Sequence, residues 1–121
     1  MTPPTAGQLP GWCEPLLTRV RSARTEDFTR LRTPRAGGRA SAVLVLLGED
    51  PAHGPDVLLV QRAATLRNHA GQPAFPGGAA EPGDADPAAT ALREANEEVD
   101  LDPRSVTVLA QLPRLWIPVS D

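Results

Sequence analysis

The chain has 121 residues, 40% of them hydrophobic and 22% charged, which is the size and composition of a single globular domain. No apolar run approaches the roughly 18 residues that a membrane helix needs, and the N-terminus lacks the basic and apolar regions of a secretion signal. The single Cys13 cannot form an internal disulfide, which favours a reducing compartment. We therefore expect a cytoplasmic protein with no membrane partner.

Charge is distributed unevenly along the chain. Residues 1–40 contain seven arginines and three acidic residues, a balance of +4, whereas residues 41–121 contain five arginines and twelve acidic residues, a balance of −7, and these sum to the net charge of −3. An acidic domain repels nucleic-acid phosphates, so we expect no nucleic-acid partner. We interpret residues 1–40 as an Arg- and Pro-rich, solvated segment with one short helix, and residues 41–121 as the functional domain.

The first half of the chain predicts one helix and two strands. Leucine and valine recur at helical spacing after Pro15, which predicts a helix over residues 14–24. The apolar runs at 42–47 and 56–62 predict two strands. The connection over 49–55 is too rich in proline for a two-residue turn, but it suits a looser antiparallel connection.

The middle of the chain predicts a long loop and an extended return. Residues 63–72 contain one large apolar side chain, Leu66, and loops of that length are usually functional. The sequence PAFPGG at 73–78 predicts an extended segment that ends in a tight glycine turn.

One strong helix follows. Asp86 can cap it, Pro87 suits its first position, and apolar residues recur at spacings of three and four up to its end near residues 99–102. The alternating sequence at 105–112 then predicts another strand. Strands that flank an amphipathic helix predict a mixed α/β layered domain.

Three glutamates share one face of this helix. At 100° per residue, Glu97 lies at 300° and Glu98 at 40° from Glu94, along the edge of the apolar stripe, while Arg93 points away from that stripe. Like charges within one turn repel, and a divalent cation would relieve the repulsion. Oxygen ligands without His or Cys suit Mg²⁺ or Mn²⁺ better than zinc. The alternative is that this face is simply solvated, as Glu-rich helix faces commonly are.

The sequence GAAEPGDADPAATALREANEEVDL, from Gly78 to Leu101, resembles the Nudix signature: Gly, five residues, Glu, seven residues, then Arg-Glu-apolar-any-Glu-Glu-any-Gly-apolar. The core at 93–98 matches. The distance from Gly78 to Arg93 is one residue longer than in the pattern, and Asp100 replaces the closing Gly. The extra residue, within Gly-Asp-Ala-Asp, resembles the coenzyme A diphosphatase branch of the Nudix hydrolases. The sequence LLVQRAATLRNHAGQPAFPGG at 58–78 resembles the segment that this branch carries before the signature.

The resemblance implies a Nudix-type α/β/α sandwich around a mixed sheet. Because family members continue past the Leu-Trp-Ile-Pro-Val-Ser stretch, we expect the domain to be incomplete at its C-terminus. The implied activity is metal-dependent hydrolysis of coenzyme A or acyl-coenzyme A to adenosine 3',5'-bisphosphate and 4'-phosphopantetheine or its acyl form.

The resemblance also implies roles for particular residues. The catalytic residues would be Arg93, Glu94 and Glu97, with Arg93 steering a glutamate by ion pairing and Glu94 as the alternative base for the attacking water. Mg²⁺ or Mn²⁺ would be held by Glu94, Glu97, Glu98 and the carbonyl of Gly77. The candidate contacts to coenzyme A, chosen because planar donors suit an anionic ligand, are Arg62, Arg67, His69 and Gln72.

Two alternatives stay open. One is a Nudix hydrolase of another nucleoside diphosphate derivative, such as a nucleotide sugar, although the segment at 58–78 favours coenzyme A. The other is a non-catalytic module that keeps the fold, which the substitution at Asp100 permits and the intact glutamates oppose.

Overall fold

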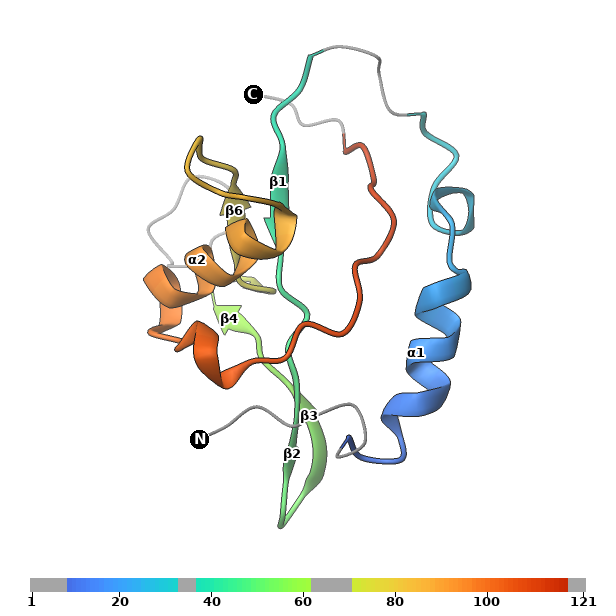
Figure 1. Ribbon diagram of the computed structural model, residues 1–121, viewed down its shortest axis with the longest axis vertical. Helices are drawn as coiled ribbons and strands as arrows, with labels where there is room; N and C mark the ends of the chain where they lie inside the picture. The colour runs from blue at the N-terminus through green and yellow to red at the C-terminus, as the bar shows by residue number, and fades with distance from the viewer. Residues whose placement is uncertain (1–8, 33–36, 62–70, 118–121) are drawn as a thin grey trace. The chain divides into compact units, whose positions relative to one another are not determined.

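The computed structural model describes residues 9–32, 37–61 and 71–117 (Figure 1). These residues belong to two compact units, one formed from residues 1–38 and 104–121 and the other from residues 39–103. In the described ranges, no helix is both long and apolar enough to cross a membrane.

The first unit contains the predicted N-terminal helix. Helix α1 (Cys13–Ser22) begins one residue earlier than expected and also ends two residues earlier than expected. It ends where Ala23 takes an extended backbone conformation. Cys13 is the buried residue of the helix. A short 3₁₀ turn (Thr25–Asp27) follows, and the Thr25 hydroxyl donates a hydrogen bond to the carbonyl of Arg114 at 3.0 Å. The prediction of a short helix in this region is confirmed.

The strand predicted at 105–112 is wrong. The chain forms a 3₁₀ turn at Pro103–Ser105, and residues 106–117 form no strand. Alternation of apolar residues marks a strand only where a neighbouring strand supplies a hydrogen-bonding ladder. In the described part of the chain each strand is paired with one other strand, and none of these pairings includes residues 105–112.

The second unit is built on three two-stranded antiparallel ladders. The run predicted as one strand at 42–47 splits into β1 (Ser41–Val43) and β2 (Leu47–Asp50). The reason is a change of partner. The amide of Leu44 donates to the carbonyl of Pro76 at 2.8 Å, whereas the carbonyl of Leu46 accepts from the amide of Leu58 at 3.0 Å.

The second predicted strand divides in the same way. Strand β3 (Gly54–Val57) pairs with β2, and β4 (Val60–Gln61) pairs with β5 (Pro73–Ala74). The antiparallel connection between the first two runs is confirmed, although the strands reach further into it than expected.

Strand β6 (Gly77–Ala79) pairs with β1, so that Gly78 faces Ala42 and Gly77 faces Val43. The tight glycine turn predicted here is therefore wrong, because both glycines are strand residues. A Cβ at Gly77 would collide with the Ala42 carbonyl oxygen and the Val43 backbone. The two glycines serve close packing rather than a change of chain direction.

Helix α2 (Pro87–Val99) begins and ends as the sequence predicts. The carboxylate of Asp86 accepts a hydrogen bond from the amide of Ala89 at 2.8 Å, which confirms the N-cap. At the other end Asp100 adopts the left-handed conformation, with φ of 61°. Helices commonly end on such a residue, usually a glycine, and this explains why the resembled signature has glycine at this position.

Helix α2 lies against β1 and β6 (Figure 1). Its buried residues are Thr90, Ala91 and Ala95, and Ala95 is completely inaccessible to solvent. Small side chains on this stripe let the helix backbone approach the ladder closely. The mixed α/β class is thus confirmed, and all pairings among the described strands are antiparallel, where the sequence predicts a mixed sheet.

Candidate functional site

The carboxylate of Glu94 lies on the ladder surface next to β6. It lies close to Gly78, where a Cβ atom would come within 2.5 Å of the Glu94 carboxyl carbon. The Glu94 side chain is 18% exposed, so the carboxylate is largely shielded from water. Of the three glutamates on this helix face, Glu94 is the one that the packing of α2 holds against the ladder.

Arg93 connects four acidic side chains. Its Nη1 lies 3.3 Å from an oxygen of Glu94, 3.3 Å from Glu97 and 3.5 Å from Glu81. Its Nε donates to Asp84 at 3.0 Å. The helical wheel directs Arg93 away from the apolar stripe, yet its long side chain turns back along the helix and is only 22% exposed.

Asp84 anchors this guanidinium. Its two oxygens accept from both Nε and Nη2 of Arg93, at 3.0 and 3.1 Å, in a bidentate pair. One of these oxygens also accepts from the Glu81 amide at 2.9 Å and the Thr90 hydroxyl at 2.8 Å. The Arg93 guanidinium, followed by the Glu81 amide and the Thr90 hydroxyl, lowers the pKa of the Asp84 carboxyl below its ordinary value of 3.8. The same hydrogen bond from Arg93 to Asp84 raises the pKa of Arg93.

A third contact completes the anchor, since Nη2 of Arg93 also donates to the carbonyl of Ala79 in β6 at 2.9 Å. The guanidinium is thereby fixed to the turn before α2 and to the ladder beneath it. Its remaining nitrogen, Nη1, faces Glu94 and Glu97. Arg93 thus links the turn before α2 to these two carboxylates.

The cluster has an excess of negative charge. One guanidinium faces the four carboxylates of Glu81, Asp84, Glu94 and Glu97, which leaves a formal charge of −3 when all are ionised. Such a concentration of carboxylate oxygens favours a hard divalent cation. The donor chemistry therefore fits Mg²⁺ or Mn²⁺.

The predicted site residues are only partly brought together. Arg93 contacts both Glu94 and Glu97. Over residues 9–32, 37–61 and 71–117, however, no three His, Cys, Asp or Glu side chains are placed to hold a metal ion. Glu97 instead points along the exposed edge of the helix, with 54% of its side chain accessible. The metal-ligand roles of Glu94, Glu97, Glu98 and Gly77 stay predictions.

Of the four candidate contacts to coenzyme A, the structure describes one. Arg62, Arg67 and His69 lie outside the described residues. Gln72 is described and is exposed just before β5. Its assignment as a substrate contact also stays a prediction.

The part played by Asp84 was not predicted from the sequence. A signal was available, because counting from Gly78 the signature places its first glutamate at position 84. Glu81 was missed as well, and it contributes the outermost ion pair to Arg93. Neither residue stands on α2, so the periodicity of the helix could not reveal them.

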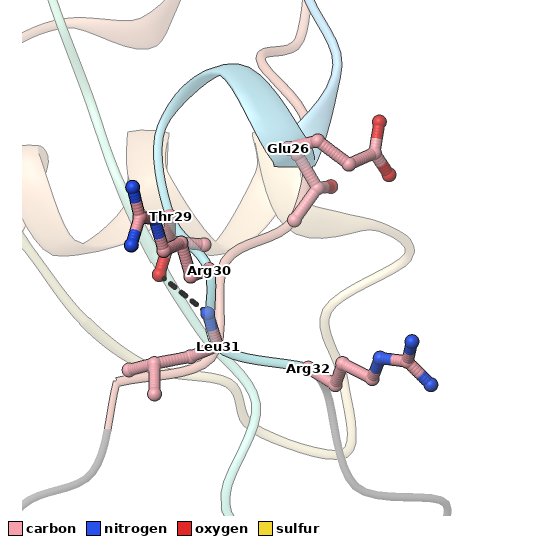
Figure 2. A pocket seen from close by; sticks show the side chains of 6 residues that line it. Glu26, Thr29, Arg30, Leu31 and Arg32 are labelled. Carbon is pink, nitrogen blue, oxygen red and sulfur yellow. Dashed lines mark hydrogen bonds between the residues drawn. The ribbon is translucent and has the colours of Figure 1, made fainter.

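The Arg-rich segment of the first unit lines a pocket. Figure 2 shows Glu26, Thr29 and Leu31 beside the two arginines at 30 and 32. The amide of Leu31 donates to the Thr29 hydroxyl at 3.0 Å. Both arginines are exposed, in keeping with the interpretation of this segment as solvated.

A comparison with protein families places this chain. A model of the NUDIX domain matches residues 38–118, and the chain belongs to the Nudix family. Members of this family generally use divalent metal ions.

Curated relatives are similar over the same region. A protein of Cronobacter sakazakii named "Uncharacterized Nudix hydrolase NudL" is 55% identical over 75 residues, which are 62% of this chain and 38% of that protein. A protein of the same name from Klebsiella aerogenes is 50% identical over 80 residues, 66% of this chain and 65% of that protein. One from Photorhabdus laumondii is 59% identical over 61 residues, 50% and 33% of the two chains. The matched region thus spans between one third and two thirds of these relatives.

Proposed function

We propose that this chain carries the catalytic signature of a metal-dependent diphosphatase that hydrolyses coenzyme A or acyl-coenzyme A. Water would add across the diphosphate to give adenosine 3',5'-bisphosphate and 4'-phosphopantetheine or its acyl form. The observation that carries the proposal is the cluster of Arg93 with Asp84, Glu94 and Glu97, because Asp84 comes from the turn with the extra residue of the coenzyme A branch.

We assign the roles as follows. Glu94, Glu97 and Glu98, together with the carbonyl of Gly77, would hold Mg²⁺ or Mn²⁺. When bound, the cation neutralises the charge of the diphosphate and lowers the pKa of a coordinated water. The Glu94 side chain is largely shielded and held in position, whereas the side chain of Glu97 is exposed and could rotate toward the cation.

Arg93 would act on the reaction through the glutamates that it orients. Glu94 is the alternative base, since a shielded carboxylate can take a proton from the attacking water. Substrate binding would involve Gln72 together with Arg62, Arg67 and His69. We further propose a cytoplasmic setting, where coenzyme A would be available.

The proposal is tested by incubating the chain with coenzyme A and Mn²⁺ and detecting both products by mass spectrometry. Glu98→Gln should lower the rate by at least about 100-fold while the far-UV circular dichroism is unchanged. Glu49→Gln is the matched control, because it makes the same chemical change on exposed β2. Full activity of Glu98→Gln would remove the metal assignment. Hydrolysis of a nucleotide sugar in place of coenzyme A would overturn the substrate assignment.

A further inference from the structure

We infer that Gly78 is a positioning residue for the carboxylate of Glu94. The space that any side chain at position 78 would fill is the space that the carboxylate occupies. The catalytic consequence of this inference rests on the proposed function, whereas the positioning itself can be measured without metal or substrate.

The contact between the two residues is too close for a side chain at position 78. An added Cβ would lie 2.5 Å from the carboxyl carbon of Glu94 and 2.6 and 2.8 Å from its two oxygens. Non-bonded carbon atoms are at their optimum about 3.5–4.0 Å apart. The carboxylate would therefore have to retreat by about 1 Å to accommodate a methyl group.

Arg93 also contacts this carboxylate. Nη1 of Arg93 lies 3.3 Å from Glu94, and that guanidinium is itself tied to Asp84 and to the Ala79 carbonyl. Glu94 is thus in contact with a fixed guanidinium and also lies close to the backbone of a strand residue without a side chain. A methyl group on the strand would push the carboxylate out of a position that Arg93 otherwise stabilises.

The neighbouring glycine has a different role. A Cβ at Gly77 would meet the backbone of Ala42 and Val43, so a substitution there must disturb the β1–β6 ladder. At Gly78 the three nearest atoms belong to the end of one flexible side chain, Glu94. Gly78 has no positive φ, so an alanine can adopt its backbone conformation. Gly78→Ala should therefore displace Glu94 while the fold is kept.

The first measurement is the Mn²⁺ affinity of the purified chain, determined from the electron paramagnetic resonance signal of the free ion. We expect Gly78→Ala to weaken binding by about 10–100-fold, the range found when groups that orient metal ligands are changed. Gly83→Ala is the matched control, because a Cβ there meets no atom within 4 Å. Its affinity should equal that of the unmodified chain.

A shorter side chain at position 94 should remove most of the effect of the added methyl group. Glu94→Asp withdraws the carboxylate by one carbon–carbon bond, about 1.5 Å, which exceeds the retreat that the methyl group demands. In the E94D background, adding G78A should then reduce Mn²⁺ affinity less than about threefold. An unspecific loss of packing at position 78 would be equally harmful in both backgrounds.

The second measurement needs no metal. Thermal unfolding in a chelator is compared for the unmodified chain, G78A, E94A and the double variant. We expect G78A to lower Tm in the presence of Glu94 and to have an effect at least about 2 °C smaller in the E94A background. Additive Tm changes, or a Mn²⁺ affinity of G78A equal to that of G83A, would overturn the inference. Coupled Tm changes in a chain that binds no Mn²⁺ would support the positioning and overturn the proposed function instead.

Discussion

Substitution of Asp84 by asparagine tests whether the turn before α2 controls the position of the Glu94 and Glu97 carboxylates. Asp84 accepts four hydrogen bonds, two of them from Arg93. In its better orientation, an asparagine oxygen keeps the bonds from the Glu81 amide, the Thr90 hydroxyl and Nη2 of Arg93. Its amide group then faces Nε of Arg93, so that two donors oppose each other. In the other orientation the amide opposes both the Glu81 amide and Nη2.

Either orientation removes the negative charge and half of the bidentate pair. The guanidinium would no longer be fixed on the side opposite to Glu94 and Glu97. We expect kcat/KM with coenzyme A and Mn²⁺ to fall by about 10–100-fold, as is typical when a group that orients ligands is lost. Asp86→Asn is the control, because it makes the same change two residues away and asparagine caps helices as well as aspartate does.

The same variant has an expected pH signature. Because the folded structure lowers the pKa of Asp84 below 3.8, its stabilising effect is complete above that value and is lost as pH falls through the lowered folded pKa. The Tm difference between the unmodified chain and Asp84→Asn should be constant from about pH 5 to 8 and narrow below about pH 4. The reasoning would be refuted if Asp84→Asn matched Asp86→Asn both in kcat/KM and in the dependence of Tm on pH.

Three further substitutions test the helix itself, each by urea unfolding. Ala95→Leu should lower the free energy of unfolding by about 1–3 kcal/mol, because Ala95 is inaccessible to solvent and leaves no room against β1 and β6. Asp100→Gly should raise it by up to about 1 kcal/mol, since glycine adopts the left-handed conformation without strain. Asp86→Ala should lower it by about 1 kcal/mol through loss of the hydrogen bond to the Ala89 amide. An unchanged midpoint in any of these three variants would contradict the packing, the C-cap or the N-cap, respectively.

Helix α2 was predictable because its signals are local. Asp86 and Pro87 fix its start, which the structure reproduces. The spacing of the apolar residues correctly predicts burial of Ala91 and Ala95, although Val99 is exposed. The carboxylates on its edge were identified in the same way. Even the departure at Asp100 is explained locally, by the conformation of a helix end.

The strands were less predictable because their ends depend on partners far along the chain. Nothing within residues 42–47 signals that the hydrogen-bonding partner changes from the segment that contains β6 to the segment that contains β3 between Leu44 and Leu46. The partners of Arg93 were hidden for a similar reason, since Asp84 and Ala79 precede the helix and meet the side chain only after the turn has folded back. Periodicity describes one element at a time, and this cluster spans three segments.

The β1–β6 ladder also has a consequence for the order of folding. It joins Ala42 to Gly78, which are 36 positions apart (78 − 42). Closing so long a loop is entropically unfavourable, and pairings distant in sequence form slowly, whereas a capped helix forms from neighbouring residues within microseconds. The acidic helix is therefore a fast, local structure, and the strand surface against which Glu94 rests is a slow, non-local one. Under the proposed function, the moment at which this chain could first hold a cation would be set by chain closure and not by helix formation.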